Sequence, residues 1–536
     1  MTKQHEDDAG FTRRDFLHGV GGAGGFAAVY GVMSALGMLS AEGCATRPAL
    51  TPGAGRGARV LILGGGIAGL TAAYELRKGG YDVRVLEAQA RPGGRVFTVR
   101  RGSVIEESDS RQTVDWDDDP ELFFDAGAAR LPAHHQGILG YARELNVPLE
   151  VLSNENRNAL LQTRDAFDGK PQANRRVYAD ARGFVAELAA KAIDQASLSQ
   201  PLGDEDKDKL RLFLRNFGDL DESLVYHGSQ RGGFRALPGG GTARGEPLDP
   251  LALSQLVRAS FWSQLTTVTE GPTQAPTMLR PVGGMAKIAE AVARSLGRLV
   301  RYEAEVVQLR REGTRAKVTW RDRRRGTLTT EDADFVLVTI QPGLLPTLDH
   351  DFASDVREAL AAPTGSPLAK VGFQAKRRFW ELDAQIYGGI SWTDHSITQI
   401  WYPSQGIHGQ KGALVGAYVF RDGEEFAKLS LPERIELALA GGEILHPGYR
   451  RWVEKGVSIS WRKVRWASGG TTHWTDADRR TAYARLLEPD GPYYFAGEYL
   501  SYINGWQEGA IQSMRHSVDK IAETNRRRSY AQGKTP

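Results

Sequence analysis

Cysteine is nearly absent from this sequence. Cys44 is the only cysteine among 536 residues, so a disulfide within the chain and a cluster of thiolate metal ligands are both excluded. The 11 histidines contain no H-x-x-x-H pair and no other spacing typical of metal ligands. The sequence therefore predicts no metal site.

A strong excess of charge of one sign is also missing. Lys and Arg together number 68 and Asp and Glu 65, which gives a formal net charge of +3. No basic block with interleaved aromatic residues is present, so we expect no nucleic acid partner. A chain of 536 residues is too long to fold around one ordinary hydrophobic core, so two or three domains are expected.

The first 45 residues have the features of an export signal. The sequence TRRDFL at 12–17 matches the twin-arginine pattern, and an uncharged run at 19–41 follows that is too rich in glycine for a membrane span. We expect residues 1–45 to be a signal peptide read by the twin-arginine translocase, which leads to the periplasm or the cell exterior. Lipid attachment at Cys44 and cleavage nearby both stay open. The Pro- and Gly-rich stretch 46–57 is expected to be a linker.

A nucleotide-binding βαβ pattern follows the expected linker. The apolar run 59–63 leads into Gly64-x-Gly66-x-x-Gly69, a helical stretch and a second apolar run that ends at Glu87. The glycines permit a tight turn, close approach of the backbone to a pyrophosphate, and close packing of the helix on the strand. Glu87 is placed to accept hydrogen bonds from a ribose diol, and its charge disfavours a 2′-phosphate. The pattern predicts a dinucleotide site, and an ordinary turn without a ligand is the alternative.

The sequence RPGGR at 91–95 distinguishes NAD from FAD. It resembles the second pyrophosphate signature of the glutathione-reductase-like FAD proteins, particularly the flavin amine oxidase superfamily. Its glycines permit another close approach of the backbone, and Arg95 can neutralise phosphate. The cofactor implied by this resemblance is FAD.

Further motifs resemble the bacterial L-amino-acid oxidases within that superfamily. The sequence GAARLP at 127–132 is similar to the segment whose arginine holds the substrate carboxylate, which implies that role for Arg130. Amine and polyamine oxidases lack this arginine. In the sequence WYP at 401–403, Tyr402 is the better match to the tyrosine that joins the arginine, and Trp401 is then a packing residue.

Lys370 stands in an apolar strand context, between Ala369 and Val371. The resembling enzymes place a lysine here, bonded to a water near flavin N5, which implies a catalytic role. The alternative is a strand lysine whose ammonium group reaches the solvent. The sequences YFAGEY at 494–499 and NGWQEGA at 504–510 match the last FAD signature, and Trp506 is expected to form a wall of the substrate pocket.

Two sets of site residues are implied besides Lys370. The substrate-binding set is Arg130, Tyr402, Gly470, Thr471 and Trp506. The cofactor-binding set is Gly64, Gly66, Ile67, Ala68, Gly69, Glu87, Ala88, Arg91, Gly94, Arg95, Ala129, Arg130, Val306, Trp466, Gly497, Glu498, Gly505 and Trp506.

The resemblance also implies the architecture. We expect an α/β protein with a glutathione-reductase-like FAD-binding fold, a mixed-sheet substrate domain and a helical insertion domain. Three separated segments, 58–150, 275–345 and 455–525, should assemble the FAD-binding domain around a parallel sheet. The other expected segments are a helical insertion at 151–274, a substrate domain at 346–454 and a C-terminal tail at 526–536.

The implied reaction is oxidative deamination of an L-amino acid by O₂ to the 2-oxo acid, ammonia and hydrogen peroxide, with hydride transfer from Cα to flavin N5. The sequence does not determine which amino acid is used. The alternatives are a monoamine or polyamine oxidase, an amino-acid 2-monooxygenase, and a redox-silent flavin-binding protein. Arg130 disfavours the amine oxidases, and Lys370 with Trp506 disfavours the silent binder. A homodimer stays open.

Overall fold

The structure is a computed structural model that describes residues 50–195, 202–260 and 268–531. The expected signal peptide, with Cys44, lies outside the described residues, as do the first part of the expected linker and the last residues of the expected tail. The described chain is a mixture of helices and sheets, which confirms the α/β class. Within these ranges, no helix combines the length and apolarity that a membrane crossing requires.

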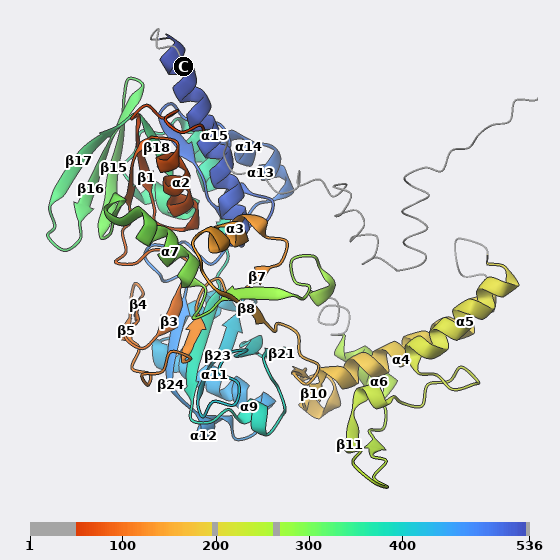
Figure 1. The fold of residues 1–536 in the computed structure, drawn as a ribbon. Coiled ribbons are helices and arrows are strands. Elements are labelled where there is room, and N and C mark those ends of the chain that lie inside the picture. The colour runs from red at the N-terminus through yellow and green to blue at the C-terminus, as the bar shows by residue number, and fades with distance from the viewer. Residues whose placement is uncertain (1–49, 196–201, 261–267, 532–536) are drawn as a thin grey trace, which may run out of the picture. The chain divides into compact units, whose positions relative to one another are not determined.

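A five-stranded parallel sheet organises one part of the fold (Figure 1). Its strands, in spatial order, are β14 (Val300–Arg301), β2 (Asp82–Leu86), β1 (Arg59–Leu63), β18 (Phe335–Val338) and β26 (Tyr493–Phe495). The strands β1 and β18 are almost continuously apolar and buried, as expected for parallel strands that are covered on both faces. Three distant parts of the sequence therefore meet in one sheet.

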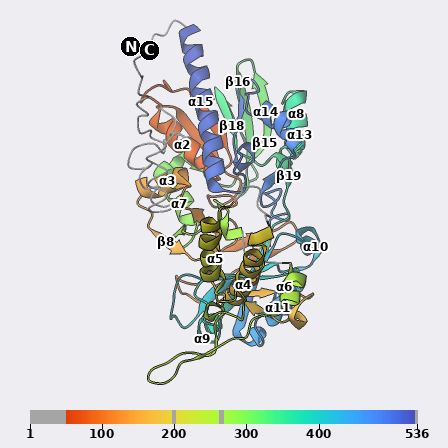
Figure 2. The same ribbon diagram turned by 90° about the vertical axis from the view of Figure 1, so that its right-hand side faces the viewer.

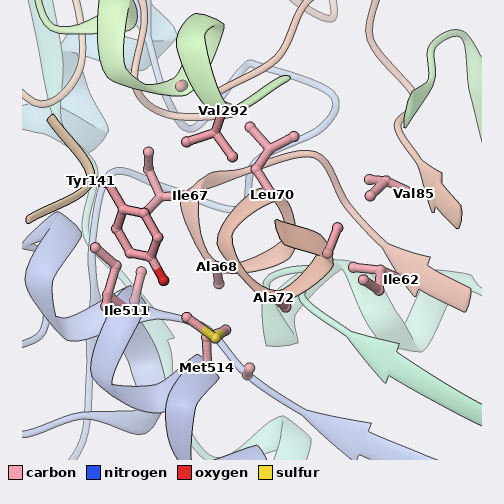
Figure 3. Packing of buried hydrophobic residues seen from close by; sticks show 14 of the residues in the cluster. Ile62, Ile67, Ala68, Leu70, Ala72, Val85, Tyr141, Val292, Ile511 and Met514 are labelled. Carbon is pink, nitrogen blue, oxygen red and sulfur yellow. The ribbon is translucent and has the colours of Figure 1, made fainter. Parts of the chain in front are cut away.

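Helices cover one face of this sheet. They are α2 (Ile67–Lys78), α3 (Gln136–Glu144), α7 (Ala286–Leu296) and α15 (Gln507–Ala531). Figure 3 shows Leu70 of α2 beside Val292 of α7, and Met514 of α15 on the side of α2 that carries Ala68 and Ala72. The helices α2 and α15 lie side by side, as Figure 2 also shows.

The opposite face of the sheet packs against a smaller antiparallel sheet and two helices. These elements are β15 (Ala304–Glu312), β16 (Arg315–Asp322), β17 (Leu328–Ala333), α8 (Ser354–Ala361) and α14 (Ala482–Leu486). Leu61 and Leu63 of β1 point into this second core, whereas Val60 and Ile62 point toward the helices. This alternation is the ordinary period of a strand.

A seven-stranded mixed sheet forms the second large layer. In spatial order its strands are β10 (Gln172–Ala173), β9 (Leu160–Gln162), β21 (Gly389–Thr393), β22 (Gln399–Tyr402), β23 (Gly412–Val419), β20 (Ala369–Ala375) and β24 (Val453–Ser460). One face packs against α9 (Phe379–Leu382), α11 (Leu431–Leu445) and α12 (Tyr449–Trp452). The other face packs against residues between Phe97 and Ala126, which follow the second FAD motif.

Two expected segment boundaries differ from the strand pairing. The helical insertion, expected at 151–274, contains α4 (Asn174–Ala192), α5 (Asp204–Gly218) and α6 (Leu253–Ala259), but β9 and β10 precede these helices and belong to the seven-stranded sheet. The strand β24 falls mostly within the expected third FAD segment, yet it pairs with β20. The hydrogen-bond partners that decide sheet membership lie far away in sequence.

Short pairings complete the described fold. They are β3 (Thr98–Arg100) with β6 (Phe123–Asp125), β4 (Val104–Glu106) with β5 (Arg111–Thr113), β13 (Met278–Pro281) with β7 (Leu131–Pro132) and β8 (Leu149–Leu152), β11 (Phe234–Ala236) with β12 (Glu246–Pro247), and β19 (Thr364–Gly365) with β25 (Thr472–His473). Two short helices, α10 (Gly423–Lys428) and α13 (Asp476–Arg480), lie in the connections.

Candidate active site

A cavity of about 790 Å³ lies at the carboxyl end of the parallel sheet. Gly64, Glu87 and Thr339 line it, and each directly follows a strand of that sheet. Gly497 lines it just beyond β26. The carboxyl edge of an open α/β sheet is the usual place for a ligand.

The three glycines of the first motif have three separate geometric reasons. Gly64 has a φ of +110°, which disfavours any residue with a Cβ. A Cβ built on Gly69 would stand 2.0 Å from the carbonyl oxygen of Gly64, so only glycine lets α2 pack this close to β1. A Cβ on Gly66 would meet no protein atom within 4 Å. Because Gly66 lines the cavity, that open space is where a pyrophosphate can approach the backbone and the N-terminus of α2.

Glu87 is a buried carboxylate at the cavity wall. Its Oε2 accepts a hydrogen bond from the Gly65 N–H at 2.6 Å, and its Oε1 accepts one from the Gln89 N–H at 2.7 Å. Burial raises the pKa of Glu87, while these two hydrogen bonds and the charges of Arg91 and Arg323 oppose that shift. The carboxylate keeps further acceptor capacity for a ribose diol.

A second buried carboxylate, Glu498, joins three segments around the cavity. Its Oε1 accepts hydrogen bonds from Arg95 at 2.8 Å and from the Thr472 hydroxyl at 3.0 Å. Its Oε2 accepts one from the Gly505 N–H at 2.8 Å. Arg95 also donates to the carbonyl of Gly470. The last FAD motif is therefore tied to the second one by a partly buried ion pair between Arg95 and Glu498.

Most of the expected site residues line this cavity. They are Gly64, Gly66, Ile67, Ala68, Glu87, Ala88, Gly94, Arg95, Val306, Lys370, Trp466, Gly470, Thr471, Gly497, Glu498, Gly505 and Trp506. Gly69, Arg91, Ala129, Arg130 and Tyr402 do not line it. The guanidinium of Arg91 stacks 3.9 Å from the ring centre of Phe97, and burial lowers its pKa to about 10. The open backbone at Gly66, the carboxylate of Glu87 and the cavity that both line fit FAD.

Lys370 is buried, with 2% of its surface exposed, so the alternative of a solvent-directed strand lysine is wrong. Its Nζ donates hydrogen bonds to the carbonyl oxygens of Asp125 and Gly127, each at 2.8 Å. Burial and the nearby charge of Arg130 lower its pKa to about 7, although Asp125 acts in the opposite direction. An amine that titrates near neutrality at a cavity wall is a candidate for proton transfer.

Arg130 is held by aromatic rings. Its guanidinium carbon lies 4.8 Å from the ring centre of Trp401 and 5.9 Å from that of Trp506. Burial lowers the pKa of this guanidinium, and the partly exposed Arg130 lines the second cavity described below. Within the described ranges, no carboxylate acts on its pKa. A shielded cation without an anionic partner is a ready site for a carboxylate ligand.

The role expected for Tyr402 is not supported by its position. Its hydroxyl lies 2.7 Å from Ser391 Oγ and 2.6 Å from His446 Nε2, in the core on the helix-covered face of the seven-stranded sheet. Trp401, its neighbour, points to the opposite face, because successive strand residues alternate. The residue expected to be mere packing therefore contacts Arg130, and Tyr402 does not.

Tyr418 is the tyrosine on the Arg130 side of the sheet, and the sequence motifs did not identify it. It pairs directly with Lys370 across β20 and β23, and its ring centre lies 4.7 Å from Lys370 Nζ. Gly416 is an extra residue in β23, and this bulge places Val415 and Tyr418 on the same face despite their odd spacing. Strict alternation of side chains along β23 would place Tyr418 on the wrong face of the sheet.

A second cavity of about 360 Å³ adjoins the first. Tyr418 lines both cavities and Arg130 lines the second, so these two residues mark the junction. Lys370 and Trp506 line the first cavity on the other side of that junction. The arrangement suits a small molecule whose carboxylate binds at Arg130 while an adjacent carbon faces the FAD cavity.

Comparisons with known proteins agree with this geometry. A family described as flavin containing amine oxidoreductase matches residues 67–522. The flavin-dependent L-tryptophan oxidase RebO of Lentzea aerocolonigenes is 26% identical over 495 residues, which cover 86% of this chain and 98% of the relative. An L-amino-acid oxidase of Notechis scutatus scutatus is 23% identical over 474 residues, which cover 85% of this chain and 84% of the relative.

Solved structures show the same fold at lower identity. A putrescine oxidase bound to putrescine aligns with a TM-score of 0.56 at 18% identity, covering 87% of this chain and 98% of the other. Cyclohexylamine oxidase from Brevibacterium oxydans IH-35A aligns with a TM-score of 0.57 at 16% identity, covering 87% and 99%. The cofactor of this protein is FAD, as expected from its motifs. With its family match spanning most of the sequence and its FAD cavity built from the same segments, the chain belongs to the flavin-containing amine oxidoreductase family.

Proposed function

We propose that this protein is an L-amino-acid oxidase that converts an L-amino acid, O₂ and water into the 2-oxo acid, ammonia and hydrogen peroxide. The observation that carries the proposal is the enclosed guanidinium of Arg130, which has aromatic neighbours, no carboxylate partner among the described residues, and a place beside the FAD cavity. Relatives described as L-amino-acid oxidases support the same substrate class. An amine substrate would leave this cation without an anion.

Substrate binding follows from the junction of the two cavities. The α-carboxylate binds the planar guanidinium of Arg130 with paired hydrogen bonds, and the hydroxyl of Tyr418 donates to the same carboxylate. Trp401 and Trp506 pack against the guanidinium and fix its plane. This placement directs Cα toward Lys370 and the FAD cavity.

Lys370 is suited to hold or accept a proton during the reaction. A neutral amine has two N–H donors and one lone pair, and the two carbonyls of Asp125 and Gly127 use both donors. The pKa of Lys370 is about 7, so at a higher pH its lone pair is free to take a proton from the substrate ammonium, directly or through a water. Bound FAD supplies the two-electron acceptor, which O₂ then reoxidises.

Anaerobic bleaching of the flavin tests the proposal. The holoenzyme is mixed, without O₂, with each of the twenty L-amino acids and with the amine that each gives on decarboxylation. We expect at least one L-amino acid to bleach the flavin, its amine to act much more slowly, and admission of air to give peroxide and a 2-oxo acid. Equal bleaching by the amine would replace this proposal with an amine oxidase, and an amide product in air would indicate a monooxygenase.

A further inference from the structure

We propose that the second cavity, here termed the Arg130 chamber, holds the substrate side chain and selects a neutral side chain that both donates and accepts hydrogen bonds, such as the carboxamide of L-glutamine. The proposal rests on the proposed function, because it needs the α-carboxylate at Arg130. Several elements build the chamber: the strands β21, β22 and β23, the segment after β8, and the start of α4.

Two amide side chains of the chamber are buried and only half paired. Asn154 is 6% exposed, and its Nδ2 donates to the carbonyl oxygen of Gln274 at 2.8 Å. Gln399 is 4% exposed, and its Oε1 accepts from Trp401 Nε1 at 2.5 Å. Each partner can only accept or only donate, so the orientation of both amides is determined. Among the described residues, neither Asn154 Oδ1 nor Gln399 Nε2 has a hydrogen-bond partner, so both remain for a ligand.

Asn174, the first residue of α4, repeats this arrangement. It is 8% exposed, and its Oδ1 accepts from Arg157 Nη1 at 3.4 Å, which leaves Nδ2 as a donor. These three buried amides thus offer two donors, on Asn174 and Gln399, and one acceptor, on Asn154. A carboxamide presents the complementary pair, one acceptor oxygen and one donor NH₂ group.

The charges around the chamber argue for a neutral side chain. Glu155 forms an ion pair with Arg157 at 2.8 Å, and the guanidinium carbon of Arg157 lies 3.4 Å from the ring centre of Tyr178. A cationic side chain would have to compete with Arg157 for Glu155. Arg421, the other cation of the lining besides Arg130, is exposed, so water screens its attraction for an anionic side chain.

An apolar substrate side chain would leave the second polar group of each half-paired amide without a hydrogen-bond partner. A buried polar group that loses its hydrogen bond is costly, and a site built for hydrogen bonding rejects an analogue that lacks the bonding group. L-glutamine and L-norleucine have side chains of similar length, and they differ in the carboxamide. We expect kcat/KM of the wild-type holoenzyme for L-glutamine to exceed that for L-norleucine by about tenfold or more.

The wild-type comparison uses five probes: L-glutamine, L-norleucine, L-tryptophan, L-lysine and L-glutamate. The expected result is the highest kcat/KM for L-glutamine. A higher value for L-norleucine or L-tryptophan would assign the chamber to apolar or aromatic side chains and overturn the inference. A higher value for L-lysine or L-glutamate would show that Glu155 or Arg421 dominates.

A substitution within the chamber tests the amides directly. Asn174→Leu should lower the ratio of kcat/KM for L-glutamine to that for L-norleucine about tenfold, because it removes a donor and adds apolar surface. Asn158→Leu is the matched control, since Asn158 lies close in sequence but outside the lining and should keep the wild-type ratio. If Asn174→Leu lowers the melting temperature or FAD content, Asn154→Leu serves as the second variant. An unchanged ratio in a folded variant would contradict the assignment.

The two levels of proposal fail in different ways. If no L-amino acid bleaches the flavin, the proposed function itself is wrong. If L-amino acids bleach it but the apolar ones are preferred, only the assignment of the Arg130 chamber is wrong.

Discussion

The guanidinium of Arg130 lies between aromatic rings beside the FAD cavity, and no carboxylate among the described residues offsets its charge. Arginine in such a place stays protonated, because its ordinary pKa is far above neutrality even when burial lowers it. A shielded positive charge is unfavourable by itself, and a bound carboxylate relieves that cost. We therefore expect Arg130 to bind an anion and not only to pack against its aromatic neighbours.

Arg130→Met should lower kcat/KM for the preferred L-amino acid by about tenfold to hundredfold, since hydrogen bonds to charged groups contribute about 1.5–3 kcal/mol. FAD content, read from the visible absorbance, should not change, because Arg130 does not line the FAD cavity. Arg143→Met, at an exposed arginine of α3, is the control and should behave as wild type. A wild-type enzyme that oxidises the decarboxylated amine as well as the amino acid would contradict the assigned role.

Lys370 gives a prediction of pH dependence. Its pKa is lowered from 10.5 to about 7, so the amine carries a proton below pH 7 and loses it above. The anaerobic rate of flavin bleaching should therefore rise as the pH increases through about 7. Lys370→Met should keep FAD, slow bleaching by about a hundredfold or more, and abolish this step in the pH profile. Wild-type rates with an unchanged profile in the variant would exclude a proton-transfer role.

Between β1 and α2, one glycine is required by the fold and another by the cofactor. Gly69 is limited by protein atoms and Gly66 only by the ligand, since a Cβ on Gly69 clashes with Gly64 and one on Gly66 meets open space. Gly66 also has a φ of −74°, which any residue can adopt. Two substitutions three residues apart should therefore have different consequences.

Gly66→Val should fold with nearly the apoprotein stability of the wild type but bind no FAD, because the side chain occupies the path of the pyrophosphate. Gly69→Ala should lower the free energy of unfolding of the apoprotein by about 1–3 kcal/mol or more, as overpacking does. Thermal denaturation and the flavin absorbance of each variant measure the two effects. If the Gly66→Val protein still bound FAD, the pyrophosphate could not lie against the backbone of Gly66.

The two faces of the seven-stranded sheet lead to opposite expectations for two tyrosines. Tyr418→Phe should lower kcat/KM for the L-amino acid about tenfold with little change in stability, because it removes one donor at the cavity junction. Tyr402→Phe should leave kcat/KM unchanged and destabilise the fold by about 1 kcal/mol or more, because Ser391 and His446 lose a buried partner. Steady-state kinetics and thermal unfolding of both variants check this. If Tyr402→Phe lowered kcat/KM and Tyr418→Phe did not, Tyr402 would be the tyrosine that binds the substrate carboxylate.

At the scale of the whole molecule, the FAD cavity depends on nearly the entire described chain. Its lining begins at Gly64 and ends at Ala510, and the residues between come from the parallel sheet, the seven-stranded sheet and α15. A partly folded chain cannot form such a site, so FAD must bind as folding completes. We propose that the protein is exported after folding, by the twin-arginine route, which carries folded proteins.

Replacing Arg13 and Arg14 together with lysine should trap yellow, FAD-loaded protein in the cytoplasm, because the translocase reads the guanidinium pair and not charge alone. Cell fractionation with activity measurements shows where the enzyme accumulates. The wild-type sequence expressed in the same strain is the reference. Unchanged export of the double variant would show that the arginine pair is incidental.

The contiguous parts of the site could be predicted from the sequence. The turn at Gly64, the cradle at Gly66 and the acid at Glu87 all depend on neighbours within one βαβ unit, so their spacing alone determines their geometry. The sequence left two alternatives for Lys370, a role beside the flavin implied by the resemblance or a solvent-directed ammonium group, and only its burial at the cavity wall excluded the second. The parallel pairing of β1 with β2 follows from the same unit.

Only the tertiary structure decided the parts that depend on distant partners. The bulge at Gly416 turns Tyr418 toward Arg130, and the register of β22 turns Tyr402 away. The strand β24 joins the seven-stranded sheet because its hydrogen-bond partner is β20. Among the half-paired amides of the Arg130 chamber, Gln399 comes from a segment more than two hundred residues away from Asn154 and Asn174. A local motif carries its geometry in its own backbone, whereas the face of a side chain and the walls of a cavity are set by long-range pairing and packing.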